Sequence, residues 1–430
     1  MSADQRLERA LPAILADLGA GPRPDYVDTL LARTAVTRQR PRWVFPERWI
    51  PMSAISGRLV AAPRVPLRAV AILALLVLAL VASAVLIGSQ QRRLPPPFGP
   101  AGNGLIPYVS SGDIFVGDPV TGTSRLLIGE AGDDSAPAFS PDGTQIAFLR
   151  DVGAGTGHLP VDIYVAKADG TDRRRITSRP IADLVWASWS PDSRSLAVIQ
   201  SDASVNQLDL LDTSGNGRVT RVAAAVGADE MQFRPPDGRE ILFRALVRGK
   251  YGLFVMNADG TNLRTLIAPT IPADVTLGLR GAVYSADGSR IFFQQADPTS
   301  PIQHYCCRLW VMNADGTDAH EFVPPGTESW DGEAVVSPDG SRIAYWHNPN
   351  NGPPHGVSVV RADGTGPAIE TGPKLSGTAH WIWAPDSSKI LMYPDDGSSA
   401  SAYLLDPAGG PWETVPWTSD ADLDWQRVAR

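Results

Sequence analysis

The stretch VVSPDGSRIAYW, residues 335–346, decides the fold, because close copies of it recur along the chain. An apolar residue leads into Ser-Pro-Asp-Gly, and an alternating apolar run follows. Asp-Gly favours a tight hairpin turn, since Gly adopts a positive φ at low cost. The alternation of Ile343 and Tyr345 with other residues predicts a following strand with one buried face.

Five further copies begin at Ala138, Ser188, Gln232, Val283 and Ile382, and a second motif built on Ala-Asp-Gly-Thr follows most of them. Each unit therefore holds four short strands and two tight turns in roughly 47 residues, which is typical of a β-propeller blade. The residues predicted to form these turns are Asp142, Gly143, Asp192, Asp237, Gly238, Asp287, Gly288, Asp339, Gly340 and Asp386 in the first motif, and Asp169, Gly170, Asp259, Gly260, Asp315, Gly316, Asp363 and Gly364 in the second.

The two ends of the repeat region complement each other. Residues 104–128 supply the last three strands of a unit but have no Pro-Asp motif before them. Residues 422–428 resemble a first strand with nothing after it, and Trp425 stands where Phe139 and Trp189 stand in their units. We therefore predict an all-β, seven-bladed propeller of four-stranded blades over residues 104–430, in which 104–128 and 422–428 close blade 1.

These repeats resemble the Pro-Asp, or WD-like, propeller repeats of the TolB family. The resemblance rests on SPDG followed by IAF at residues 140–148 and on MNADGT at 256–261 and 312–317, and it extends over nearly all of 104–430. Ala286 in place of Pro and the Pro235–Pro236 pair depart from the pattern. The resemblance implies a periplasmic or extracellular binding propeller.

An uncharged apolar run, residues 69–88, predicts a transmembrane helix. Its 20 residues at about 1.5 Å each would span a hydrocarbon core of about 30 Å. Residues 1–68 carry 11 Arg and 6 acidic residues, whereas residues 89–430 carry 27 basic and 40 acidic residues. We expect a single-pass protein of the cell membrane with a cytoplasmic N-terminus, a Pro-rich linker at 89–103 and an extracytoplasmic propeller.

The segment 1–68 is predicted to form two short helices and a basic juxtamembrane stretch that carries Trp43 and Trp49. That stretch could lie at the lipid headgroups, or the segment could dock a cytoplasmic partner. Two helices, one membrane helix and an exported domain resemble the layout of membrane-bound anti-sigma factors, which implies a sigma factor as the partner. The segment contains neither His nor Cys, so the zinc motif of many such factors is missing.

Chemistry-bearing motifs are scarce. The sequence contains neither G-x-S-x-G nor a phosphate-binding loop, so no catalytic, cofactor or metal residue is predicted. Carboxylates that recur once per blade indicate a structural role, although a ring of them could hold a cation. Cys306 and Cys307 are adjacent, so an ordinary strand would keep both thiols free, and a vicinal disulfide is the alternative.

The net charge of −8 argues against a nucleic-acid partner. These observations favour a non-enzymatic propeller that binds a protein or a small molecule at its axis. Two alternatives stay open: a transmembrane anti-sigma-type regulator with the propeller as its sensor, and a propeller hydrolase or lactonase.

Overall fold

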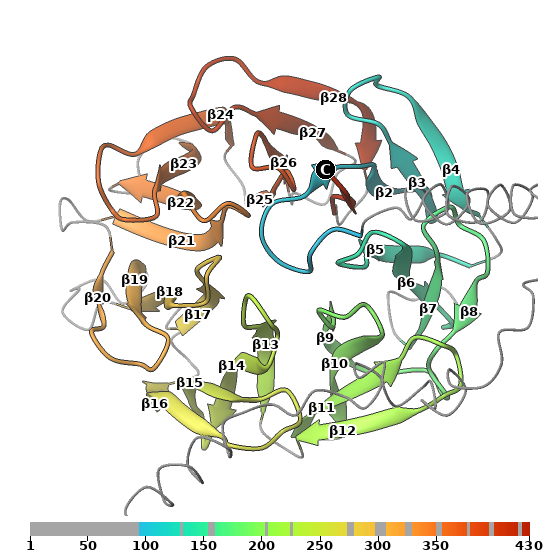
Figure 1. Ribbon diagram of the computed structural model, residues 1–430, viewed down its shortest axis with the longest axis horizontal. Coiled ribbons are helices and arrows are strands. Elements are labelled where there is room, and N and C mark those ends of the chain that lie inside the picture. The colour runs from blue at the N-terminus through green and yellow to red at the C-terminus, as the bar shows by residue number, and fades with distance from the viewer. Residues whose placement is uncertain are drawn as a thin grey trace, which may run out of the picture. The chain divides into compact units, whose positions relative to one another are not determined.

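The computed structural model describes residues 94–129, 132–153, 160–202, 205–223, 227–272, 279–296, 307–322, 329–349, 355–375, 379–394, 400–419 and 424–430. The predictions for residues 1–68, for the membrane span 69–88 and for Cys306 lie outside these ranges. Within them the chain forms strands and turns, and it contains no helix that could cross a membrane. Their sheets stand around a central axis like the blades of a propeller (Figure 1).

Each blade is an antiparallel sheet whose strands follow one another in chain order. Blade 1 contains β2 (Ile106–Ser110), β3 (Asp113–Gly117) and β4 (Ser124–Ile128); blade 2 contains β5 (Asp134–Phe139), β6 (Gln145–Asp151), β7 (Val161–Lys167) and β8 (Arg174–Arg175). Blade 3 contains β9 (Leu184–Trp189), β10 (Ser195–Asp202), β11 (Val205–Asp212) and β12 (Val219–Ala223); blade 4 contains β13 (Ala228–Phe233), β14 (Glu240–Val247), β15 (Lys250–Asn257) and β16 (Arg264–Pro272).

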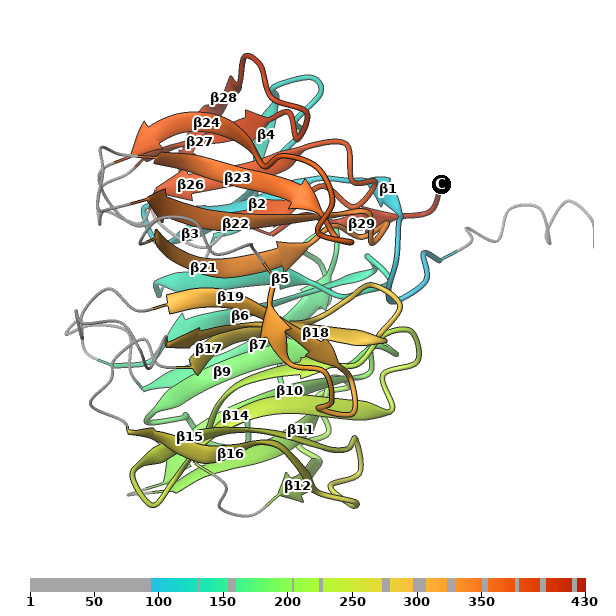
Figure 2. The ribbon, with the colours of Figure 1, turned by 90° about the vertical axis from the view of Figure 1, so that its left-hand side faces the viewer.

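The remaining blades repeat this order (Figure 2). Blade 5 contains β17 (Leu279–Tyr284), β18 (Arg290–Ala296), β19 (Cys307–Asn313) and β20 (His320–Glu321); blade 6 contains β21 (Ser329–Val336), β22 (Arg342–Pro349), β23 (His355–Arg361) and β24 (Ile369–Leu375). Blade 7 contains β25 (Ala379–Trp383), β26 (Ile390–Pro394), β27 (Ala400–Leu405) and β28 (Glu413–Ser419), and a short pair joins β1 (Gly102–Asn103) to β29 (Arg427–Val428). The prediction of an all-β, seven-bladed propeller of four-stranded blades is confirmed.

Local turn chemistry explains why the Pro-Asp motif ends each first strand. In blade 2 the amide of Gly143 donates to the carbonyl of Ser140, and Gly143 adopts a φ of 68°. The Asp142 carboxylate accepts hydrogen bonds from the Ser140 hydroxyl and from the amide of Thr144. These bonds fix the turn within five residues of sequence, and the same amide-to-carbonyl bond recurs in blades 5 and 6. In blade 4 the turn is one residue longer, and Gly238 donates to the carbonyl of Arg234.

The core lies between blades rather than inside them. Seven clusters of buried apolar side chains occur, one at each interface between neighbouring blades. At the interface of blades 3 and 4, for example, Ile199 and Leu208 pack with Phe243 and Phe254. Because both faces of every sheet are covered, each blade depends on its two neighbours for burial.

The C-terminal stretch supplies the inner edge of blade 1. The amide of Gln426 donates to the carbonyl of Leu105 at 2.9 Å, and the amide of Gly104 donates back to the carbonyl of Gln426. The indole of Trp425 is 5% exposed and donates to the Gly104 carbonyl at 3.2 Å. The two ends of the described chain are thereby joined within one blade.

The last part of the predicted linker lies against the propeller. The Arg427 guanidinium donates to the carbonyl oxygens of Pro96 and Gly99, at 2.9 and 2.6 Å. Ala101 is buried, and its amide donates to the carbonyl of Pro385. These bonds bring Phe98, between the two carbonyls, against the cluster shared by blades 3 and 4.

Candidate functional site in the central channel

In blades 2 to 7 the first strand is an edge strand of its sheet and lies nearest to the axis around which the blades stand (Figure 1). In five of these strands the register with the second strand shifts near the middle, as it does between Ser135 and Ala138 of β5. A bulge of this kind turns a side chain away from the regular alternation. These bulges lie at, or one residue before, the fourth residue from the end of the strand, whereas β25 keeps a regular register.

We call the residues at this fourth position the ring residues; each stands three positions before the last residue of its first strand. They are Ala136, Trp186, Glu230, Gly281, Glu333 and His380. Three of them have a positive φ: Ala136 at 48°, Gly281 at 56° and Glu333 at 51°. Non-glycine residues adopt this conformation at a cost, and such strain is found preferentially at functional sites.

Four ring residues follow one another across blades 4 to 7, and we call Glu230, Gly281, Glu333 and His380 the acid arc. The Gly281 amide donates to Oε2 of Glu230 at 2.9 Å. A Cβ atom at Gly281 would lie 4.0 Å from the Cα atom of Glu333. Nδ1 of His380 lies 3.9 Å from Oε2 of Glu333. Because Gly281 has no side chain, space remains between the backbones that carry the two glutamates.

The two carboxyl groups of the acid arc have different surroundings. Glu230 is half-buried, and burial raises the pKa of its carboxyl, as does the nearby charge of Asp229. Arg244, whose Nη2 lies 3.1 Å from Oε1 of Glu230, acts in the opposite direction. The side chain of Glu333 is 54% exposed, beside His380 at 46%. Two ionisable groups in unlike environments suit separate acid and base roles.

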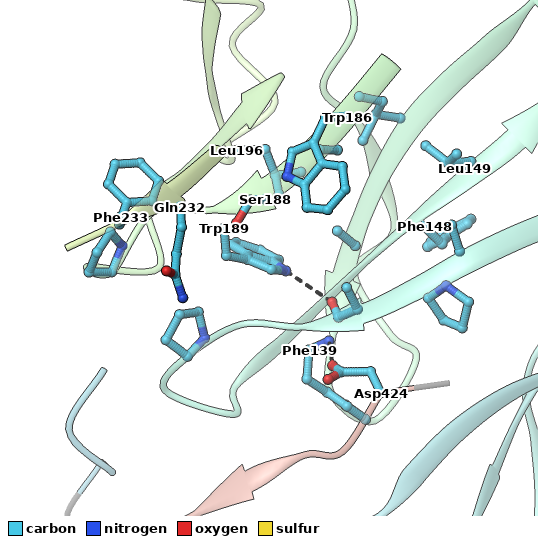
Figure 3. Close-up of a pocket in the computed structure, with 18 of the residues that line it drawn as sticks. Phe139, Phe148, Leu149, Trp186, Ser188, Trp189, Leu196, Gln232, Phe233 and Asp424 are labelled. Atoms are coloured by element: carbon cyan, nitrogen blue, oxygen red, sulfur yellow. Dashed lines mark hydrogen bonds between the residues drawn. The ribbon is translucent and has the colours of Figure 1, made fainter. Parts of the chain in front are cut away.

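An apolar pocket of about 840 Å³ opens beside the channel at blades 2, 3 and 4 (Figure 3). This volume is in the range of small-molecule sites. Trp186 and Trp189 of β9 contribute to its wall, together with Phe233 of β13 and Phe98 of the linker. The Trp189 indole donates to the Ala138 carbonyl at 3.0 Å, which fixes the plane of that ring.

Asp424 lies at the edge of this pocket, beside Phe139 (Figure 3). Its Oδ2 accepts a hydrogen bond from the Phe139 amide at 2.7 Å. Burial raises the pKa of the Asp424 carboxyl, while hydrogen bonds from the amides of Phe139 and Trp425 and the charge of Arg427 lower it. Gln232 acts similarly between blades 4 and 5, because its Oε1 accepts from the amide of Tyr284 at 2.7 Å.

The turn aspartates predicted from the repeats are dispersed, one at each turn. Their carboxylates accept bonds from their own turns, as Asp259 does from the amide and hydroxyl of Thr261 at 2.9 and 2.6 Å. Within the part of the chain that the structure describes, no group of three or more His, Cys, Asp or Glu side chains is arranged to hold a metal ion.

Sequence reasoning missed the acid arc. Its members occupy one column of the repeat, three residues before the end of each first strand, and that column varies from Ala to Trp, Glu, Gly and His. A column of unlike residues within an otherwise regular repeat was the available signal. It could be found by aligning the units and looking for irregular positions as well as for repeated ones.

No family model matches this chain. An oligogalacturonate lyase in complex with manganese is 14% identical and has a TM-score of 0.54, with 75% of this chain and 85% of that chain covered. A periplasmic gluconolactonase from Pseudomonas aeruginosa is 17% identical with a TM-score of 0.50, and the match covers 76% and 99%. TolB from Acinetobacter baumannii is 19% identical with a TM-score of 0.42, over 66% of each chain. The fold that the TolB-like resemblance implies, a seven-bladed propeller, is the one that the strands of the described residues form.

These comparisons overturn the prediction of a non-enzymatic binding propeller, because proteins of the same architecture include a lyase and a lactonase. That prediction was wrong to rely on the lack of a catalytic sequence motif. In a propeller each blade contributes single residues to the axis, so a site need not leave a contiguous motif in the sequence. Function has to be argued from the geometry of the channel.

Proposed function

We propose that this protein is a propeller hydrolase of the lactonase type, and that the acid arc is its catalytic site. The observation that carries the proposal is the order Glu230, Gly281, Glu333 and His380 across four successive blades. Neighbours in this order are in contact: the Gly281 amide with the Glu230 carboxyl, the Gly281 Cβ position with the Cα atom of Glu333, and the Glu333 carboxyl with the His380 imidazole. The existence of enzymes with the same fold supports this proposal.

The reaction needs one proton acceptor and one proton donor. Either Glu333 or His380, whose side chains are 54% and 46% exposed, would take a proton from water as its oxygen adds to the carbonyl carbon of a lactone or ester. The ring C–O bond then breaks, and the leaving alkoxide takes a proton. Glu230 would supply that proton, because its raised pKa keeps the carboxyl protonated to higher pH than an ordinary glutamate. The product is a hydroxy acid, and water is the only other reactant.

The test is hydrolysis of small lactones, among them glucono-δ-lactone, and of aryl acetates by the full-length protein. We expect His380→Ala to lower kcat about 100-fold or more, the usual size of a general acid–base contribution. His320→Ala is the matched control, since that imidazole is 59% exposed on the outer strand β20. Wild-type rates equal to buffer, or equal rates for His380→Ala and wild type, would refute the proposal.

A further inference from the structure

The apolar pocket described above has a single ionisable group in its lining. Twenty of its lining residues are uncharged apolar or small residues or Ser188, and the two remaining are Gln232 and Asp424. Among the residues that the structure describes, no lysine, arginine or histidine lines it. A carboxylate in an otherwise uncharged wall favours a cationic ligand and disfavours an anionic one.

Aromatic rings make up much of the same wall. Trp186 and Trp189 lie on β9, and Phe233 and Phe98 come from the next blade and from the linker (Figure 3). Trp186 is 41% exposed although it is a large apolar side chain, so a good part of its ring remains available for contact. The faces of such rings attract ammonium groups, and clusters of them recognise quaternary ammonium ions.

One hydrogen-bond donor also borders the pocket. The Gln232 side chain uses its oxygen to accept from the Tyr284 amide. That bond orients the amide group of Gln232, which also lines the pocket, and leaves its NH₂ group as a donor. A ligand that carries an acceptor a few ångströms from its cationic centre could use this donor.

We infer that this pocket is a binding site for a small organic cation, an ammonium group on an apolar framework, held by Trp186, the neighbouring rings and the Asp424 carboxylate. No residue of the acid arc lines this pocket, although both sites use β13, and the inference does not depend on the proposed hydrolysis. Phe98 makes the linker part of the pocket wall, so an occupied pocket also stabilises the contact between linker and propeller.

The test uses three probes of one shape and different charge: benzyltrimethylammonium, its neutral carbon isostere neopentylbenzene, and the anion phenylmethanesulfonate. Binding to the full-length protein in lipid nanodiscs is measured by titration calorimetry, with empty nanodiscs as the blank. We expect the cation to bind at least about tenfold more tightly than the neutral probe, and the anion to show no binding. This comparison of the three affinities uses only the wild-type protein, so a folding defect cannot explain its result.

Two variants locate the site. Asp424→Asn keeps an oxygen that can accept from the Phe139 amide, and it should abolish the preference for the cation over the neutral probe. Trp186→Ala should weaken binding of the cation about tenfold. Trp412 has a similar exposure of 45%, and Trp412→Ala should leave the affinity for the cation unchanged. The inference is overturned if the cation binds no better than the neutral probe, or if both variants bind it like wild type.

Discussion

The backbone amide of Phe139 donates a 2.7 Å hydrogen bond to the carboxylate of Asp424, a residue 285 positions later in the sequence. The bond links the C-terminal stretch, at the inner edge of blade 1, to the first strand of blade 2. The amide of an innermost strand has no partner from a further strand of its own blade. A side chain from the preceding blade provides one here, and Gln232 does the same for Tyr284.

Ring closure should depend strongly on Trp425. Its indole is buried between blades 7 and 1, within the cluster that contains Ile106 and Trp417. We expect Trp425→Ala to lower the free energy of unfolding by about 3–5 kcal/mol, the usual cost of removing a buried tryptophan. Urea denaturation followed by circular dichroism measures this change.

The control for that experiment is Trp412→Ala, because Trp412 is 45% exposed. Its effect should stay within about 0.5 kcal/mol, as for other exposed positions. Equal effects of the two substitutions would show that the C-terminal stretch does not close the ring.

Gly143 should tolerate no side chain at its turn. Its φ is 68°, and an added Cβ atom would lie 1.9 Å from the carbonyl oxygen of Arg427. Gly217 has nearly the same φ, 70°, but has open space around it. In both Gly→Ala variants the left-handed backbone conformation lowers the free energy of unfolding by about 1–2 kcal/mol. Only Gly143→Ala adds a clash with β29.

We therefore expect Gly143→Ala to lower the melting temperature clearly more than Gly217→Ala does. Differential scanning fluorimetry of the two variants provides the comparison. Similar melting temperatures would contradict the close approach of the Asp-Gly turn to the C-terminal stretch.

Gly281→Ala should lower catalysis more than stability. A methyl group at Gly281 would occupy the gap between Glu230 and Glu333, although its nearest heavy atom, the Cα of Glu333, is at an ordinary 4.0 Å. The expected result is a loss of lactone hydrolysis, with a stability change no greater than that of Gly249→Ala. Gly249 has a φ of 74° and no atom within 4 Å of an added Cβ. Gly249→Ala therefore introduces the same kind of backbone strain as Gly281→Ala without affecting the acid arc. Full activity of Gly281→Ala would show that substrate does not use the gap.

Acid should destabilise the propeller through its turn aspartates. The Ser285 hydroxyl, which donates to Asp287, lowers the pKa of that carboxyl, and Thr261 does the same for Asp259. A carboxyl with a lowered pKa in the folded state contributes stability above its ordinary pKa of 3.8, and this stability is lost as the pH falls through the folded-state pKa.

The melting temperature should accordingly fall as the pH is lowered from about 5 to 3. In Asp287→Asn the decrease should be smaller, because one of the titrating groups is gone. An unchanged slope in this variant would show that Asp287 is not linked to folding.

The membrane anchor at 69–88 stays a prediction, and protease protection can test it. In spheroplasts of a bacterial host, the outer envelope is open and the cytoplasmic membrane is intact. An added protease should then digest the propeller and spare residues 1–68. An antibody tag at the N-terminus reports the protected fragment. Digestion of the tag in sealed cells would contradict the predicted orientation.

The sequence alone determined the blades. A Ser-Pro-Asp-Gly turn such as residues 140–143 is fixed by bonds within a few residues, so its chemistry can be read locally. Six copies of the motif, together with the complementary ends of the repeat region, give seven blades. For the same reason the pairing of the first and second strands, such as Phe139 with Ile146, follows from the position of the turn.

Only the tertiary structure decided which residues meet at the axis. Glu230, Gly281 and Glu333 are about fifty residues apart in sequence, and they become neighbours because successive blades turn about one axis and carry the same position of their first strands to it. The pocket depends on still longer connections, since Phe98 and Asp424 come from opposite ends of the described chain. Contacts of this kind depend on closure of the whole ring, so no local pattern encodes them.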